Sequence, residues 1–229
     1  MKLCPICKTK TVDDDARYCT ECGSSFDGKV VRKTSALVPK TVSAPDSKML
    51  NIGKGYKVEL SKDRQVLNRL LVDIKWQSEP GFDIDAAVFL LNKNGKVDNE
   101  IDFVFYNNPQ HQSAGATHSR IDGNHEQIAL ELKKLPINVK KLAFTLTIDE
   151  AKLRHQSFDK VNSIEINIIN GSSNQKLIRY ALNNDFSSET AIVLGEIYRN
   201  KARWKFHAVG AGFNGGLAAL CNNFGIEIN

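Results

Sequence analysis

The fold class follows from one stretch of sequence, Ile84-Asp85-Ala86-Ala87-Val88-Phe89-Leu90-Leu91, and from other β-rich runs along the chain. This short β-rich run ends just before the turn dipeptide Asn94-Gly95, a combination that is typical of strands in an antiparallel sheet. Similar runs follow one another from residue 56 onward. The predicted strands are Tyr56–Leu60, Val66–Trp76, Ile84–Leu91, Ile101–Tyr106, Gln127–Leu132, Leu142–Ile148, Ile164–Ile169, Lys176–Asn183, Thr190–Arg199 and Arg203–Val209.

Helices long enough to connect parallel strands are missing between these runs, which argues against a parallel sheet. The sequence therefore predicts an all-β fold, an antiparallel two-sheet β-sandwich, over residues 49–229. We expect one clear helix at Gly215–Phe224, where Leu217, Leu220 and Phe224 recur at helical spacing, and a short helical turn at Asn138–Lys141.

Four of the five cysteines lie in the first 22 residues, as the two Cys-x-x-Cys pairs Cys4/Cys7 and Cys19/Cys22. Four thiolates at this spacing can surround one Zn²⁺ tetrahedrally, at Zn–S distances of about 2.3 Å. The N-terminus carries no secretory signal, so we expect a reducing, cytoplasmic setting in which disulfides are disfavoured. Residues 1–26 are predicted to form a structural zinc ribbon. Cys221 stands alone and is expected to be a buried apolar residue.

Composition and charge point to a globular protein with a basic connector. Of 229 residues, 41% are hydrophobic and 25% charged, and the net charge is +5. Residues 27–48 read as a flexible linker, and within residues 29–48 five basic side chains face one acidic one. No apolar run is long enough to span a bilayer. A solvated linker explains the basic charge better than a nucleic-acid site does, since phosphate-binding proteins cluster more Lys and Arg on one face.

The sequence also contains a misleading match to a nucleotide-binding motif and a group of acidic residues. Gly210, Gly212 and Gly215 fit G-x-G-x-x-G, but the chain ends too soon for a dinucleotide fold, so we expect these glycines to serve a tight turn and close packing. Asp83 and Asp85 stand two residues apart on one face of a strand, with Cα atoms about 6.5–7 Å apart. From spacing alone they are either water-facing acids at a strand end or ligands of a hard cation such as Ca²⁺.

Several long blocks of the sequence resemble the TerD family of tellurium-resistance and stress proteins, in order from about residue 49 to 227. The matching blocks are Phe82–Asn92, Asn94–Val97, Asp102–Asn108, Glu126–Ile128, Thr190–Arg199, Trp204–Phe213 and Gly215–Leu220. The resemblance implies a β-sandwich, association with Ca²⁺ and no established enzymatic activity. The positions that match the family's calcium-binding motif are Asp83, Asp85, Asp102, Asp122 and Glu126.

The sequence departs from the family pattern in its acidic loop. Asn124 and His125 stand where aspartates are expected, Arg120 adds positive charge, and the usual Trp-Asp pair is Trp76-Gln77. Because calcium affinity follows the charge of the ligands, we hypothesise a weakened calcium site or the loss of one of two.

The sequence and the resemblance together favour a non-enzymatic, cytoplasmic stress-response module. The zinc ribbon would dock it to other stress-response or Ter-type proteins, some of them membrane-associated. The alternative is a nucleic-acid-associated adaptor that uses the ribbon and the linker residues Lys29, Arg32, Lys33 and Lys40.

Overall fold

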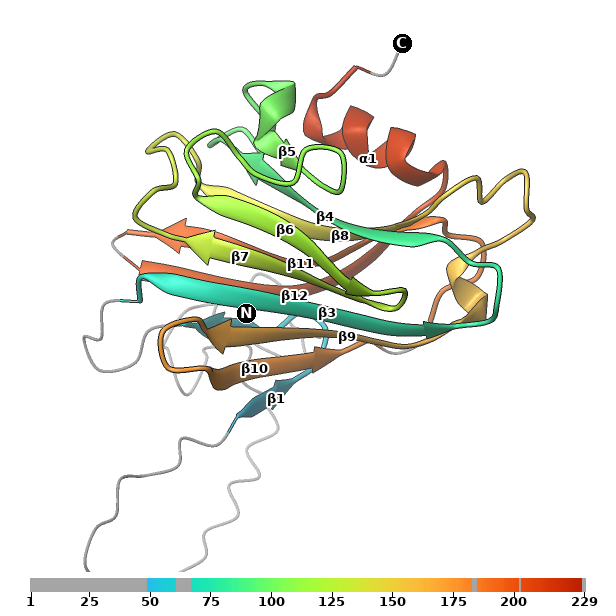
Figure 1. Cartoon of the computed structure of the whole chain (residues 1–229), viewed down its shortest axis with the longest axis horizontal. Coiled ribbons are helices and arrows are strands. Elements are labelled where there is room, and N and C mark those ends of the chain that lie inside the picture. Colours follow the sequence, from blue (N-terminus) through green and yellow to red (C-terminus); the bar gives the residue numbers. More distant parts are fainter. Residues whose placement is uncertain (1–48, 61–66, 183–184, 202, 228–229) are drawn as a thin grey trace, which may run out of the picture. The chain divides into compact units, whose positions relative to one another are not determined.

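The computed structural model describes residues 49–60, 67–182, 185–201 and 203–227. The expected zinc ribbon (1–26, with Cys4, Cys7, Cys19 and Cys22) and the linker (27–48) lie outside the described residues. Within them the chain forms two six-stranded sheets packed face to face (Figure 1). This confirms the predicted β-sandwich.

The first sheet has the order β1-β10-β9-β3-β7-β6 and the second β2-β12-β11-β8-β4-β5. The strands of the first sheet are β1 (Leu50–Ile52), β10 (Gln175–Ala181), β9 (Val161–Asn170), β3 (Arg69–Ser78), β7 (His125–Glu131) and β6 (Ala116–Asp122). Those of the second sheet are β2 (Lys57–Glu59), β12 (Arg203–Phe213), β11 (Ala191–Asn200), β8 (Lys141–Ile148), β4 (Ile84–Leu91) and β5 (Phe103–Val104). Two 3₁₀ turns, η1 (Glu100–Asp102) and η2 (Phe158–Lys160), and one helix, α1 (Gly216–Phe224), complete the described elements.

Several sequence expectations need correction. The sheets are not wholly antiparallel, because β1 pairs with β10 in parallel. The short strands β1 and β6 were not predicted, and the expected strand Ile101–Tyr106 is reduced to the two residues of β5, preceded by η1. The predicted helical turn at Asn138–Lys141 is wrong: Asn138 lies in a hydrogen-bonded turn, and Lys141 already begins β8. Strand β4, by contrast, has the predicted bounds, and α1 begins one residue after its predicted start.

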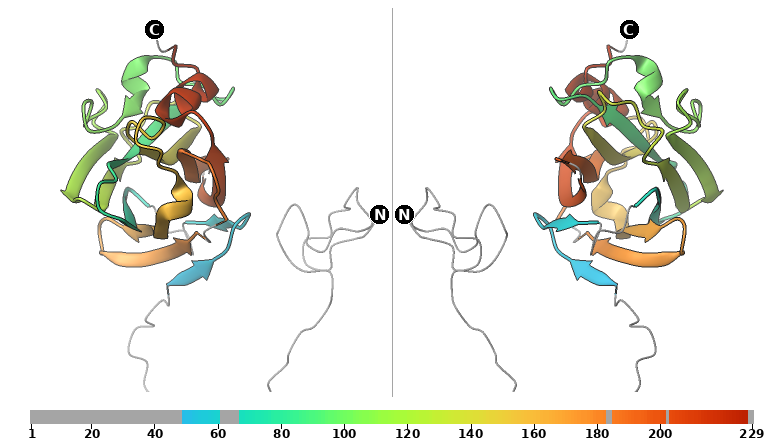
Figure 2. Two further views of the ribbon diagram at one scale, coloured as in Figure 1. Left: turned by 90° about the vertical axis from the view of Figure 1, so that its right-hand side faces the viewer. Right: turned by 90° about the vertical axis from the view of Figure 1, so that its left-hand side faces the viewer.

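Alternation along the strands separates two apolar clusters. In β4 the even-numbered residues, such as Val88 and Leu90, join the core between the sheets. The odd-numbered Ala87, Phe89 and Leu91 face outward and belong to a second cluster, which includes Leu220 and Phe224 of α1. Figure 2 shows α1 lying over this outer side of the second sheet. Cys221 is buried in the same cluster, as expected. Among the described helices, none is long and apolar enough to cross a membrane.

The glycine motif near the C-terminus serves packing. Strand β12 continues through Gly210 and Gly212 to Phe213, so the G-x-G-x-x-G pattern is not a loop between a strand and a helix. A Cβ atom on Gly212 would lie 2.4 Å from Cγ of Glu189. Gly215 has a φ of 103° and directly precedes α1, a conformation that favours glycine. Close packing therefore explains Gly212, and the turn into the helix explains Gly215.

Glycine at position 195 is required by the core. A Cβ atom there would lie 2.6 Å from Cζ of Phe206, a fully buried ring of β12. We therefore expect Gly195→Ala to lower the free energy of unfolding by about 1–3 kcal/mol, because the ring must shift in a packed core. Gly123→Ala is the matched control, since no atom lies within 4 Å of its Cβ position. Denaturant unfolding should separate the two variants; equal stabilities would contradict this assignment.

Candidate functional site

The first component of the site is an open edge of β4. Strand β5 pairs only with Val88 and Phe89, so in the described part of the chain the preceding residues of β4 have no strand neighbour on that side. The backbone N–H of Ala86 instead donates to Oε2 of Glu126 at 2.8 Å. Glu126 lies on β7 in the opposite sheet and is fully buried. Its carboxylate thus links the two sheets at the position where β5 ends.

Two further side chains from β6 complete the surroundings of Glu126. Nε2 of the buried His118 is hydrogen-bonded to Oε2 of Glu126 at 2.7 Å. Nε of Arg120 lies 2.9 Å from the other oxygen, Oε1, which is buried and accepts no well-directed hydrogen bond. The contact between Arg120 and Oε1 is therefore mainly a charge interaction. A buried carboxylate requires such compensation, because removing it from water is costly.

The guanidinium of Arg120 also faces the two aspartates of the β4 entrance. Its Nη2 pairs closely with Oδ1 of Asp85, and its Nη1 lies 3.9 Å from Oδ1 of Asp83. We call Asp83, Asp85 and Glu126, together with Arg120, the arginine–carboxylate cluster. The register of β6 with β7 places Arg120 opposite Glu126, and both side chains point toward the open edge of β4. One guanidinium thus serves three carboxylates.

Negative charge exceeds positive charge in this cluster. Burial and, to a smaller extent, the neighbouring carboxylates Glu126, Asp83 and Asp149 together raise the pKa of Asp85 from 3.8 to about 6, although Arg120 opposes the rise. The Asp85 side chain is only 17% exposed, so solvent screens these charges weakly. Repulsion and burial therefore outweigh the attraction of the single arginine.

The five residues expected to bind calcium do not form one site. Asp102 sits beside the β4–β5 pairing of Phe89 with Phe103, about 15 Å along the strand from Asp85. Its Oδ2 accepts the backbone N–H groups of Asp98 and Asn99, and its Oδ1 is bonded to His111. Asp122 caps the β6–β7 turn by accepting the N–H of Asn124. Both aspartates thus have local structural partners.

The remaining three carboxylates, Asp83, Asp85 and Glu126, do converge, but on Arg120. In the described part of the chain, no group of three or more His, Cys, Asp or Glu side chains is arranged to hold a metal ion. A Ca²⁺ ion at these carboxylates would have to displace the guanidinium. The residues present therefore do not fit a calcium site. Arg120 is the reason, and the sequence showed it only as an added positive charge near the acidic residues.

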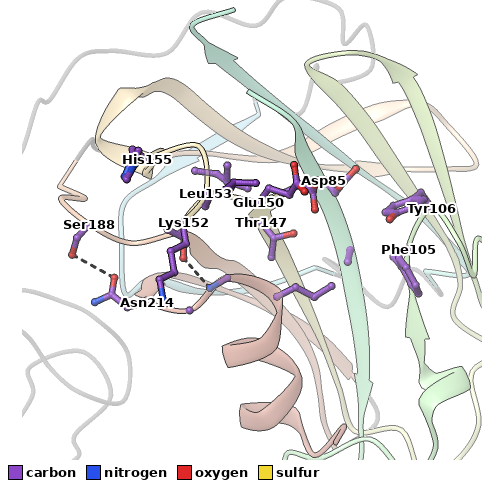
Figure 3. A pocket seen from close by; sticks show the side chains of 18 of the residues that line it. Asp85, Phe105, Tyr106, Thr147, Glu150, Lys152, Leu153, His155, Ser188 and Asn214 are labelled. Atoms are coloured by element: carbon purple, nitrogen blue, oxygen red, sulfur yellow. Dashed lines mark hydrogen bonds between the residues drawn. The ribbon is translucent and has the colours of Figure 1, made fainter. Parts of the chain in front are cut away.

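The second component is a pocket of about 990 Å³ on the outer face of the second sheet. We call it the outer-face pocket. Its floor includes the register pair Asp85 and Thr147. Phe105 and Tyr106 line one side, and Figure 3 shows Glu150 close to Asp85, with Lys152 beside Asn214 at the other end. The sequence did not reveal this pocket, because its walls come from four separate segments: residues 103–106, 149–155, 188–190 and 214–217.

Comparison with known proteins identifies the fold and its relatives. The model of the TerD domain matches residues 49–224. The uncharacterised protein YceE of Bacillus subtilis is 36% identical over 190 residues, covering 78% of this chain and 99% of YceE. General stress protein 16U of the same organism is 36% identical over 190 residues (78% and 98%). The tellurium resistance protein TerD of Serratia marcescens is 38% identical over 188 residues (78% and 98%).

The fold is also found in solved structures. A homologue of the telluride resistance protein TerD from Streptomyces coelicolor superposes with a TM-score of 0.53 at 18% identity, covering 67% of this chain and 94% of the other. At this identity the likeness supports the sandwich architecture alone.

Arg120 should stabilise the sandwich without calcium. We expect Arg120→Gln to lower the free energy of unfolding by about 1–2 kcal/mol, a figure reduced because the arginine is 42% exposed. Millimolar CaCl₂ should raise the thermal midpoint of this variant while leaving that of the wild type unchanged relative to EDTA. Arg203→Gln, which removes a surface pair with Glu59, is the control and should behave as wild type. A wild-type midpoint that rises strongly with Ca²⁺ would contradict this prediction.

Asp85 should destabilise the protein at neutral pH. Because folding raises its pKa from 3.8 to about 6, its contribution to stability is fully present below the lower value and is lost as the pH rises through the higher one. Asp85→Asn should therefore exceed the wild type in unfolding free energy by about 1–3 kcal/mol near neutral pH, and the difference should vanish below about pH 4. Denaturant titrations across this range provide the test; a variant less stable than wild type at neutral pH would refute it.

Proposed function

The chain belongs to the TerD family, and from this premise we propose that it is a non-enzymatic stress-response module that acts by binding. The observation that carries the proposal is the match of the family's domain over residues 49–224, together with relatives named for tellurium resistance and general stress. We place it in the reducing cytoplasm, where its N-terminal cysteines stay available as thiolates.

The use of the titratable groups supports a binding role rather than catalysis. Among the described residues, four histidines are paired with carboxylates: His111 with Asp102, His118 with Glu126, His125 with Asp73, and His207 with Glu196. His111 and His118 are buried, and none of the four pairs lines the outer-face pocket. The histidine that does line it, the exposed His155, belongs to none of these pairs. An acid–base catalyst must lie within hydrogen-bond reach of its substrate. These histidine–carboxylate pairs instead tie strands and turns together.

Calcium forms no part of this proposal, because Arg120 stands among the carboxylates that would bind it.

Zinc binding by the N-terminal cysteines is part of the proposal. Cys4, Cys7, Cys19 and Cys22 have the spacing of a closed four-thiolate site, whose binding energy would fold a ribbon too small to fold unaided. With all four positions taken by protein, the ribbon is a docking element, and we propose other stress-response proteins as its partners.

Complementation of a deletion strain tests both parts of the proposal. The full chain should restore growth in the presence of tellurite or a DNA-damaging agent. The quadruple variant with Cys4, Cys7, Cys19 and Cys22 changed to Ser should fail to do so, because the ribbon would lose its metal. Cys221→Ser, a change at the buried free thiol, is the matched control and should complement.

Plasma-emission analysis of the same purified proteins provides a second readout. We expect one zinc per chain in the wild type and in Cys221→Ser, and none in the quadruple variant. Full complementation by a quadruple variant that lacks zinc would remove the docking role of the ribbon. Loss of complementation with all four cysteines intact, in a strain lacking only this gene, would argue against the stress function itself.

A further inference from the structure

The outer face of the second sheet is only partly covered by α1. The helix has nine residues and is about 13 Å long, whereas the eight residues of β4 extend about 27 Å. It covers the end of β4 that carries Phe89 and Leu91. The other end, with Asp85 and Ala87, remains as the floor of the outer-face pocket. The pocket is therefore a consequence of helix length.

Its size and lining match those of small-molecule sites. A volume of about 990 Å³ lies at the upper end of the range for ligand pockets. Most of the lining surface is apolar, and Ala87, Phe105, Leu153 and Leu217 contribute to it. Leu153, one of these lining residues, is 74% exposed and so is accessible to a ligand.

The aromatic wall lies next to a carboxylate. Continuing the antiparallel register of β4 with β5 places Phe105 beside Ala87, two residues from Asp85. The ring of Phe105 stacks on Phe103 at 4.4 Å and meets Tyr106 edge-on at 5.2 Å. Tyr106 is 53% exposed. Aromatic faces and a carboxylate both attract a positive charge.

Two polar groups on the floor remain available to a ligand. Thr147 is 8% exposed, and its hydroxyl makes no hydrogen bond to another residue that the structure describes. Asp85 contacts Arg120 through Oδ1, and its Oδ2 accepts no hydrogen bond from another residue that the structure describes. The two residues are register partners on adjacent strands. They offer neighbouring oxygen acceptors at the base of the pocket.

The charges around the pocket favour a cation at this end. Asp149 and Glu150 line the pocket and share Arg154, and the nearby arginine–carboxylate cluster carries excess negative charge. The pocket's own basic residue, Lys152, lies toward Asn214 at the opposite end (Figure 3). An incoming cation therefore meets Asp85, Thr147 and Tyr106 without facing Lys152.

We propose that the outer-face pocket binds an organic cation with a flat apolar body. The cationic group lies between Asp85 Oδ2, the Thr147 hydroxyl and the faces of Phe105 and Tyr106, and the apolar body packs against Ala87 and Leu217. This inference goes beyond the stress-response function proposed above and is independent of the zinc ribbon.

The direct test is titration of the isotope-labelled full chain with naphthylmethylammonium, followed by NMR and calorimetry. The neutral naphthalenemethanol and the anionic naphthoate serve as matched probes of the same size. We expect the ammonium to bind about tenfold more tightly than the alcohol, with chemical-shift changes centred on Ala87, Thr147 and Leu217. Equal affinity for the three probes, shifts elsewhere in the sandwich, or no binding at millimolar ammonium would overturn the proposal.

Variants locate the cation within the pocket. Tyr106→Ala removes an exposed ring and should leave the fold intact while weakening ammonium binding about fivefold. Asp85→Asn should weaken ammonium binding by at least as much and leave alcohol binding unchanged. Glu100→Gln, a change at an exposed acid of η1 outside the pocket, is the matched control. If circular dichroism shows folded protein and both pocket variants keep wild-type ammonium affinity, the assignment is wrong.

Discussion

The structure around the site depends on one hydrogen bond, from the N–H of Ala86 to the carboxylate of Glu126. It exists because β5 is only two residues long and leaves the edge of β4 unpaired. A fully buried carboxylate can fill that position only if its charge is compensated. Arg120 on the adjacent strand provides the opposite charge, and His118 on the same strand adds a hydrogen bond. Arg120 in turn draws Asp85 and Asp83 toward the same point, so a local defect in strand pairing explains the whole cluster.

An arginine and a divalent cation can both compensate the charge of clustered carboxylates, but with different consequences. A calcium ion exchanges with solution, so a site that depends on it reports the calcium concentration. Arg120 is covalently part of the chain and always charged. Its guanidinium joins β6 to β4 and to β7 whatever the calcium concentration. One positive charge in place of two leaves the carboxylates undercompensated, which is consistent with the raised pKa of Asp85.

The sequence predicted the sandwich because most strands show an apolar pattern, and β4 and β8 have the predicted bounds within one residue. It failed where inward positions are polar. Strand β6 carries His118 and Arg120 on its inward side, so its pattern resembled an acidic loop. The convergence of Asp83 and Asp85 was predictable from a spacing of two residues. The roles of Asp102 and Asp122, which accept backbone N–H groups in turns, were not predictable, because residue spacing does not determine turn geometry.

Asp85 connects the two halves of the site, since one of its oxygens contacts Arg120 and the residue also forms the floor of the outer-face pocket. The ionised side chain is disfavoured in the folded protein by burial and by Glu126, Asp83 and Asp149. A cation placed in the pocket would reduce that unfavourable electrostatic energy. The carboxylate is already held in place by β4 and Arg120, so little ordering would oppose binding. The unfavourable free energy of the ionised Asp85 in the free protein would thus be relieved when a cation binds, and this relief is the source of the affinity that we propose.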